Sequence, residues 1–592
     1  MKSFSLFVAT SFVSALVIPQ YAAAVTSETV RTSAAPATPN ILNNSEKKQY
    51  AEIFSAISSQ QWNEAQRLID KAGDAPLAYM AQAELYLAAN SPRVEAPQLE
   101  ALLNKAPYLP QAERLESLAF KRGASNLPQR PGTQRFSYLG SAPKRNLPDD
   151  ISDAAGLRSE INVFIRNDDP ASAERLVESR SSSLSTPALT ELRYRVAWSY
   201  YIENQDENAR RVAQKAMANG GDWGVQAHWV NALANWRLGN QRAALESFDH
   251  VSRFASDDDL RAAGLFWSAR AAMAVKMPEQ VQVRLQNAAR LPETFYGLLA
   301  SEALGMEPLA AKQARNAALN WNALKNEKNV QIAVGLSEIG QTNLADETLR
   351  FQARIGDSSK HSDLAKLAGS LNLPATQLWM GHYGPSGGNP DATTRYPSPS
   401  WTPSGGWRVD SNLVYAHALQ ESQFRTSVIS PAGAQGLMQV RPGTAGDIAR
   451  ARGMSFSRDD LNNPSINLEY GQSYMEQLRD MSATQGLLPK VIAAYNAGPA
   501  PIARWNDEVK DNGDPLLFVE SIPYWETRGY VAIILRNYWI YESSKGKNSD
   551  SMTGLAQYMW PTFPGKDGRS VAVRANGLNG GTSIGVNSFA DR

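Results

Sequence analysis

Apolar residues recur at helical spacing along most of this 592-residue chain. Between residues 46 and 316 nearly every segment has this spacing, with short breaks. Large side chains meet small ones in successive segments, such as residues 227–239 and 242–248, which a Gly-Asn turn separates. The pattern is typical of helical hairpins stacked into a tetratricopeptide-like solenoid, although its period is irregular. We therefore expect an all-α chain whose residues 46–316 form an α-superhelical, TPR-like domain.

Changes in composition predict the later boundaries. Residues 317–400 continue as a small helical linking domain and end in a connector rich in Gly, Pro, Ser and Thr. Residues 401–545 are again helical by pattern. From 546 to 592 the chain is rich in Gly, Ser and Asn around an aromatic island at 558–561, so we expect a weakly ordered tail.

The amino terminus has the pattern of a secretory signal peptide over residues 1–24. Lys2 precedes a short apolar run that ends at Ile18, and three alanines before Val25 form a small-residue cleavage pattern. The run is too short and too polar for a membrane-spanning helix, and no later stretch approaches that length. Residues 25–45 are rich in Thr, Ala, Pro and Ser and should be a flexible lead. We expect an exported protein without an integral membrane segment.

Charge and residue usage exclude several classes of function. The 59 basic and 58 acidic residues give a net charge of +1, so nothing indicates a nucleic-acid partner. The chain has no cysteine, which excludes disulfides, thiol catalysis and cysteine-bound metals. Its five histidines are scattered and show no metal-ligand spacing. We expect neither a metal nor a cofactor.

One amphipathic helix places a carboxyl on an apolar face. Ser411 is the predicted N-cap, and Val414, His417, Ala418 and Glu421 follow at i, i+3, i+4 and i+7. An inward-facing carboxyl has its charged form disfavoured, so its pKa rises and it can serve as a general acid near neutral pH. A solvated glutamate at a helix end is the alternative. His417 on the same face is expected at the edge of the core.

Three short motifs follow this helix in a fixed order. They are Glu421-Ser422 with GLMQ at 436–439, AYNAG at 494–498, and IPYWETRGY at 522–530. Together they resemble the catalytic domain of the soluble lytic transglycosylases, a lysozyme-like α-helical fold that cleaves bacterial peptidoglycan. The resemblance extends to the layout of the chain, including Phe295-Tyr296-Gly297 near the end of the solenoid.

The resemblance implies that Glu421 is a single catalytic acid/base. It would protonate the glycosidic oxygen between N-acetylmuramic acid and N-acetylglucosamine. It would then take the proton from the C6 hydroxyl of the same N-acetylmuramic acid, so that a 1,6-anhydro ring forms without water. Glycosidases with two carboxylates need the second one as nucleophile or to activate water. Here the attacking hydroxyl is already part of the substrate, and proximity supplies that assistance.

The resemblance also implies a set of substrate-binding residues. They are Ser430, Met438, Gln439, Tyr495, Asn496 and Glu526. Three of them have structural alternatives: Ser430 could cap a turn, Asn496 could cap a helix, and Glu526 could pair with Arg528. Arg441 stands where related sequences often have methionine, which leaves that subsite open.

The same residues allow two competing functions. A true muramidase or chitinase on this fold would use water as the acceptor and need a second carboxylate. A scaffold would bind partners through the helical repeats and have a silent enzyme-like domain. The resemblance favours a periplasmic enzyme of cell-wall turnover whose partner is the peptidoglycan glycan strand. It leaves proteins of cell-wall synthesis or division as further partners of the repeats.

Overall fold

The computed structural model describes residues 39–315, 318–388, 392–574 and 585–586. The predicted signal peptide and most of the predicted flexible lead lie outside these residues. The described part is helical almost throughout, with two small antiparallel sheets. The prediction of an all-α chain is therefore confirmed.

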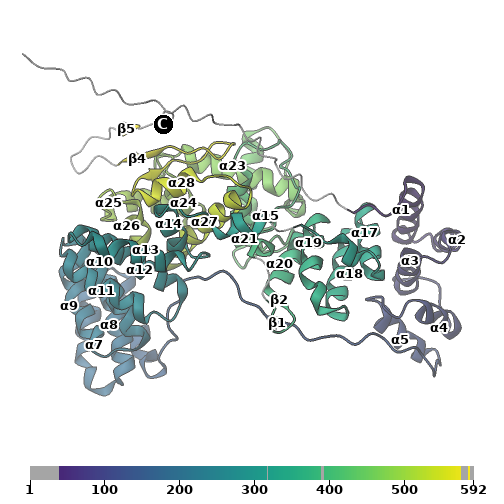
Figure 1. Ribbon diagram of the computed structural model, residues 1–592, viewed down its shortest axis with the longest axis horizontal. Coiled ribbons are helices and arrows are strands. Elements are labelled where there is room, and N and C mark those ends of the chain that lie inside the picture. Colours follow the sequence, from purple (N-terminus) through teal and green to yellow (C-terminus); the bar gives the residue numbers. More distant parts are fainter. Residues whose placement is uncertain (1–38, 316–317, 389–391, 575–584, 587–592) are drawn as a thin grey trace, which may run out of the picture. The chain divides into compact units, whose positions relative to one another are not determined.

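Helices α6 to α14 pack mainly on their neighbours in the sequence, while α15 packs on α27 (Trp525–Ser544) (Figure 1). Consecutive helices from α8 to α14 contact each other, and α8 also contacts α10 as α12 contacts α14. This is the packing of a helical solenoid, as the spacing predicted. The bounds are α6 (Ala155–Arg166), α7 (Pro170–Ser179), α8 (Thr186–Ile202), α9 (Asp206–Met217), α10 (Gly221–Arg237), α11 (Gln241–Phe254), α12 (Asp258–Ala274), α13 (Val281–Ala289), α14 (Phe295–Ala303) and α15 (Leu309–Arg315).

A second apolar core joins the first helices to those after residue 320. In it, Gly335 of α17 lies so close to α3 that a Cβ atom there would be 3.1 Å from Leu77. The first helices of the predicted superhelical domain thus share a core with the predicted linking domain. The bounds are α1 (Asn44–Ser58), α2 (Trp62–Ala72), α3 (Pro76–Leu87), α4 (Ala96–Lys105), α5 (Ala112–Lys121), α16 (Trp321–Leu324), α17 (Lys328–Glu338), α18 (Thr342–Ile355), α19 (His361–Ser370) and α20 (Pro374–His382).

An irregular segment, residues 122–151, connects α5 to α6. Its strand β1 (Ser137–Tyr138) pairs antiparallel with β2 (Tyr383–Gly384), with Tyr138 opposite Tyr383. Further along, Arg145 forms ion pairs with Asp259 and Glu520. The segment therefore contacts elements from three parts of the sequence.

The carboxy-terminal helices share their apolar core with the solenoid helices α6 to α15. Its largest fully buried side chains include Trp505, Phe518 and Trp539. The long helix α27 contacts α14, α15, α21, α24 and α26. The bounds are α21 (Ser411–Ser422), α22 (Pro442–Ala451), α23 (Pro464–Asp480), α24 (Leu488–Ala497), α25 (Pro499–Glu508), α26 (Pro515–Ser521), α27 (Trp525–Ser544) and α28 (Asp550–Ala556).

The prediction of a weakly ordered tail is wrong for residues 550–574. Helix α28 buries Met552 and Leu555 and packs on α14. Strands β3 (Trp560–Pro561) and β4 (Ala572–Arg574) pair antiparallel, and β4 pairs in turn with β5 (Gly585–Val586). The aromatic island that the composition singled out is part of the core, because Trp560 is buried.

Candidate functional site

Glu421 lies in the last turn of α21, on the face that packs inward. Val414 and Ala418, which precede it on that stripe, are fully buried. Asp410 caps the helix by accepting a hydrogen bond from the Asn412 amide, so Ser411 is the first helical residue and not the N-cap. The sequence spacing thus placed the carboxyl on the correct face of the helix.

Tyr530 is the direct partner of this carboxyl. Its hydroxyl donates a hydrogen bond of 2.6 Å to Oε1 of Glu421. Burial raises the pKa of Glu421 from its ordinary value of 4.5 to about 7; the Tyr530 hydrogen bond opposes this rise and the nearby charge of Glu526 adds to it. A carboxyl in this range can give up and regain a proton near neutral pH, as a general acid and base must.

His417 contributes no charge to the site. It is 2% exposed, and burial lowers its pKa to about 4, although Nδ1 lies 2.9 Å from the Leu413 carbonyl oxygen. Its ring packs edge-on against Tyr495, with 4.8 Å between the centroids. His417 is a buried neutral residue behind Glu421, in keeping with the sequence prediction.

The loop between α21 and α22 is held by its own polar groups. Ser430 Oγ accepts a hydrogen bond from the Ala434 amide, so the side chain caps this turn. Gln439 donates through Nε2 to the Val428 and Gly436 carbonyl oxygens, at 3.1 and 2.8 Å. Both predicted binding residues therefore shape the loop. Any sugar contact of Gln439 would have to use its Oε1.

Two glycines let this loop pack closely on α23. Gly436 has φ +78°, and a Cβ atom there would lie 2.2 Å from Asn467 Nδ2. Gly471 faces Met438, where a Cβ atom would lie 2.6 Å from Met438 Cγ. Met438 is fully buried, so the substrate-binding role that the resemblance implies for it would have to use its backbone. The apolar side chain fills the space under the loop.

Tyr495, Asn496 and Glu526, the remaining predicted binding residues, differ in their contacts. The Tyr495 hydroxyl donates to the Met438 carbonyl oxygen at 2.8 Å, which ties α24 to the loop. Asn496 Oδ1 accepts from the Thr527 hydroxyl at 2.6 Å. Glu526 is exposed. Within the described residues, the structure shows no ion pair between Glu526 and Arg528, which donates instead to the Ile522 carbonyl oxygen.

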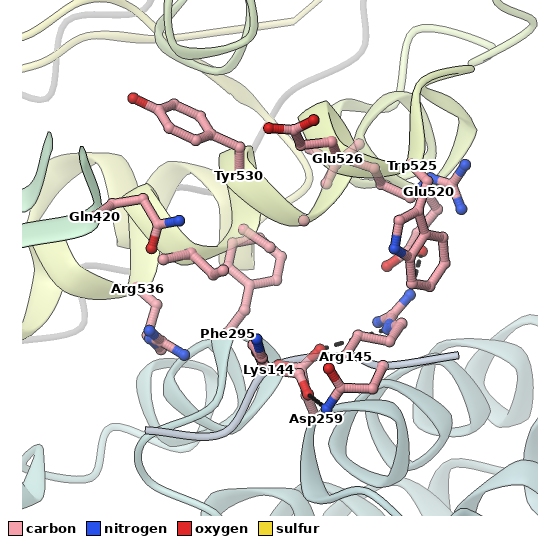
Figure 2. Close-up of a pocket in the computed structure, with 16 residues that line it drawn as sticks. Lys144, Arg145, Asp259, Phe295, Gln420, Glu520, Trp525, Glu526, Tyr530 and Arg536 are labelled. Carbon is pink, nitrogen blue, oxygen red and sulfur yellow. Dashed lines mark hydrogen bonds and ion pairs between the residues drawn. The ribbon is translucent and has the colours of Figure 1, made fainter. Parts of the chain in front are cut away.

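A cavity of about 280 Å³ lies beside the start of α27, and Glu526 and Tyr530 are among the residues that line it (Figure 2). Gln420, Trp525 and Glu526 line it from the carboxy-terminal helices, and Lys144 and Asp259 line it from the opposite wall. The cavity beside Glu526 and Tyr530 is therefore enclosed in part by residues from α12 and from the segment before α6.

Sequence reasoning missed Tyr530 although it lies in the third motif. Tyr530 and Glu526 are four residues apart near the start of α27, which puts them on one face of that helix. This i, i+4 spacing was the available signal. The contact with Glu421 joins residues 109 positions apart, which spacing within one helix does not reveal.

The described ranges contain neither a cluster of metal ligands nor a helix suited to span a membrane. No three His, Cys, Asp or Glu side chains there come together in a way that could hold a metal ion. Among the same residues, no helix combines the length and apolar character needed to cross a membrane.

The site is thus centred on a half-buried carboxyl at the end of a helix, hydrogen-bonded to a tyrosine, in an all-α domain. Residues 402–518 match the family model described as the transglycosylase SLT domain, which confirms for this part of the chain the resemblance stated from its motifs. The match includes Glu421 and Tyr495 and ends before Tyr530.

Relatives of known name extend this likeness. The soluble lytic murein transglycosylase of Salmonella typhimurium is 30% identical over 275 residues, which are 44% of this chain and 40% of that protein. The protein of the same name from Escherichia coli K12 is 36% identical over 132 residues, 22% of this chain and 20% of that protein. The chain thus spans about two fifths or less of the length of these two curated relatives.

Solved structures were also found. The 70 kDa soluble lytic transglycosylase of Escherichia coli matches over 85% of this chain and 97% of that chain, with 17% identity and a TM-score of 0.46. The lytic transglycosylase Slt of Pseudomonas aeruginosa matches over 84% of this chain and 81% of that chain, with 18% identity and a TM-score of 0.48.

Proposed function

We propose that the protein is a periplasmic lytic transglycosylase of peptidoglycan that acts in cell-wall turnover. It cleaves the β-1,4 bond between N-acetylmuramic acid and N-acetylglucosamine without water and leaves 1,6-anhydro-N-acetylmuramic acid ends. The observation that carries the proposal is the half-buried carboxyl of Glu421, with its raised pKa and its hydrogen bond from Tyr530. The family match and the names of the relatives support it.

Glu421 performs both proton transfers in this proposal. Its protonated form donates to the glycosidic oxygen as the bond to C1 breaks. The resulting carboxylate, stabilised by the Tyr530 hydroxyl, then accepts the proton of the C6 hydroxyl as the oxygen attacks C1. Ser430, Gln439, Tyr495, Asn496 and Glu526 stay proposed as substrate-binding residues, and Met438 stays proposed through its backbone.

Mass spectrometry of soluble products from purified peptidoglycan tests the reaction type. We expect muropeptides that end in the 1,6-anhydro sugar and are lighter than hydrolytic products by one water. Products with reducing ends would overturn the proposal in favour of a hydrolase. Glu526 would then be the first candidate for the second carboxylate that a hydrolase needs. An absence of products would favour a scaffold function for the helical repeats.

The pH profile of the wild-type protein should have a basic limb near pH 7. The first step needs the protonated carboxyl, and the Glu421 pKa of about 7 means that this form is lost as the pH rises. We expect kcat/KM to fall about tenfold per pH unit above that value. The rate of product release at constant ionic strength between about pH 5 and pH 9 measures it. A profile that stays flat to the top of this range would contradict a protonated Glu421 in the first step.

A further inference from the structure

We propose that Arg145, Tyr296 and Glu520 are positioning residues: they hold the corner between α26 and α27 and so fix Tyr530 and Glu526 against Glu421. We call these three residues the corner clamp. The inference deepens the proposed function and rests on it. It assigns to the solenoid and to the segment before it a direct part in building the active site.

Glu520 is the centre of the corner clamp. Its carboxylate is 2% exposed and accepts hydrogen bonds on both oxygens, from the Tyr296 hydroxyl at 2.8 Å and from Arg145 Nη1 at 2.7 Å. Arg145 also pairs with Asp259 at 3.4 Å (Figure 2). Hydrogen bonds to buried ionised groups are short and strong, so the position of Glu520 is firmly set.

The next two residues of the corner are held from the same side. The hydroxyls of Ser521 and Tyr201 lie 2.8 Å apart. The Ile522 carbonyl oxygen accepts from Arg528 Nε and Nη2, at 3.2 and 2.9 Å. The Arg528 guanidinium in turn lies over the Trp198 ring, 4.0 Å from its centroid. Three successive residues are therefore fastened by side chains that α8, α14, α27 and the segment before α6 supply.

This corner leads directly into α27, the helix that carries Glu526 and Tyr530. Helix α27 begins at Trp525, and Glu526 and Tyr530 lie in its first turns. Both act on Glu421, one through its charge and the other through a hydrogen bond of 2.6 Å. A displacement of about 1 Å at a reacting group can cost about 10²-fold in rate. Loosening the corner should therefore change the proton chemistry of Glu421 and not only the stability of the fold.

Tyr296→Phe in the full-length protein tests the clamp, because it removes one hydroxyl and keeps the buried ring. We expect faster hydrogen exchange in peptides that cover residues 515–530, as Glu520 loses one of its two donors. We also expect kcat to fall about tenfold with KM within about twofold. The basic limb of the pH profile should move to higher pH, because a weaker Tyr530 hydrogen bond lowers the pKa of Glu421 less.

Tyr200→Phe is the matched control. Tyr200 lies on α8 and donates a similar hydrogen bond of 2.9 Å to Glu174, away from the corner. Its loss should leave exchange at 515–530, kcat and the basic limb as in the wild type. If Tyr296→Phe does not fold, Ser521→Ala, which removes the contact with Tyr201, should give the same three changes on a smaller scale.

The readouts separate failure of the clamp from failure of the proposed function. Unchanged exchange at 515–530 together with an unchanged basic limb in Tyr296→Phe would overturn the clamp, even if the melting temperature falls. A wild-type protein that releases no anhydro products would overturn the proposed function. The exchange measurement would still judge whether the clamp holds the corner, because it needs no substrate.

Discussion

Glu421→Gln should release no detectable 1,6-anhydro products from purified peptidoglycan, with kcat/KM at least about 10³-fold below the wild type. General acid–base catalysis contributes about 10²- to 10⁴-fold, and here one residue supplies both the acid and the base. The amide has the size of the carboxyl but can neither donate the proton to the glycosidic oxygen nor take the proton of the C6 hydroxyl. The measurement is the initial rate of product release near pH 6, resolved by mass spectrometry. Residual activity within about tenfold of the wild type would mean that another group moves the proton.

The same substitution should stabilise the fold at alkaline pH. The Glu421 carboxyl binds its proton more tightly in the folded chain than in the unfolded one, because its pKa rises from 4.5 to about 7. The unfolded state therefore binds fewer protons in this window, and stability falls as the pH rises through it. An amide does not titrate, so the melting temperature of Glu421→Gln should exceed that of the wild type at about pH 8 and match it at about pH 4.

Glu542→Gln is the control that separates activity from ionisation. Glu542 is 1% exposed on α27, and burial raises its pKa to about 8. It lies outside the site, so its replacement should also raise stability at alkaline pH but leave product release unchanged. If this control loses as much activity as Glu421→Gln, activity depends on the buried carboxyls of the carboxy-terminal helices in general. The assignment of Glu421 as the acid and base would then be contradicted.

The position of Glu421 was predictable because it depends on one helix. The spacing from Val414 fixes which side chains face inward, and a carboxyl on that face must be desolvated. The all-α class was predictable for the same reason, since the helical spacing of apolar residues is visible within each segment. Local periodicity thus gave the helix, its buried face and the direction of the pKa shift.

The partners of Glu421 depend on contacts between distant segments, which periodicity does not contain. Tyr530 comes from a helix 109 residues later, and the corner clamp joins Arg145 to Glu520 across 375 residues. The three motifs indicated that these regions belong together, but not which atoms meet. Met438 shows what a motif leaves open: its motif suggested the cleft wall, and the close approach of Gly471 places its side chain in the core beneath the loop.

The tail was misjudged because composition averages over positions. Gly, Ser and Asn dominate the tail, yet Met552, Leu555 and Trp560 are spaced so that α28 and β3 bury them. A few large apolar side chains are enough to order a segment when a neighbouring helix such as α14 offers a surface. The polar residues around them then form the turns.

Tyr530→Phe should lower kcat between about 10- and 150-fold and leave KM within about twofold. The hydroxyl donates a hydrogen bond of 2.6 Å to the Glu421 carboxyl, and a hydrogen bond to a charged group contributes about 1.5–3 kcal/mol. It stabilises the carboxylate that forms when the proton leaves, so its removal penalises the transition state more than substrate binding. Because the hydrogen bond holds the Glu421 pKa below the value that burial alone would give, that pKa rises in the variant. The basic limb of kcat/KM should move to higher pH.

Tyr541→Phe tests whether this result is specific to Tyr530. Tyr541 lies on the same helix and is fully buried. Its hydroxyl donates a hydrogen bond of 2.9 Å to the Pro397 carbonyl oxygen and not to the Glu421 carboxyl. Its loss should cost stability but leave kcat and the basic limb unchanged. If Tyr530→Phe instead lowers kcat without moving the basic limb, the hydroxyl contacts the substrate and does not tune the acid. The change in kcat and the position of the basic limb therefore distinguish the two uses of this hydroxyl. If the basic limb stays in place, the corner clamp acts on substrate contact through α27 and not on the proton of Glu421.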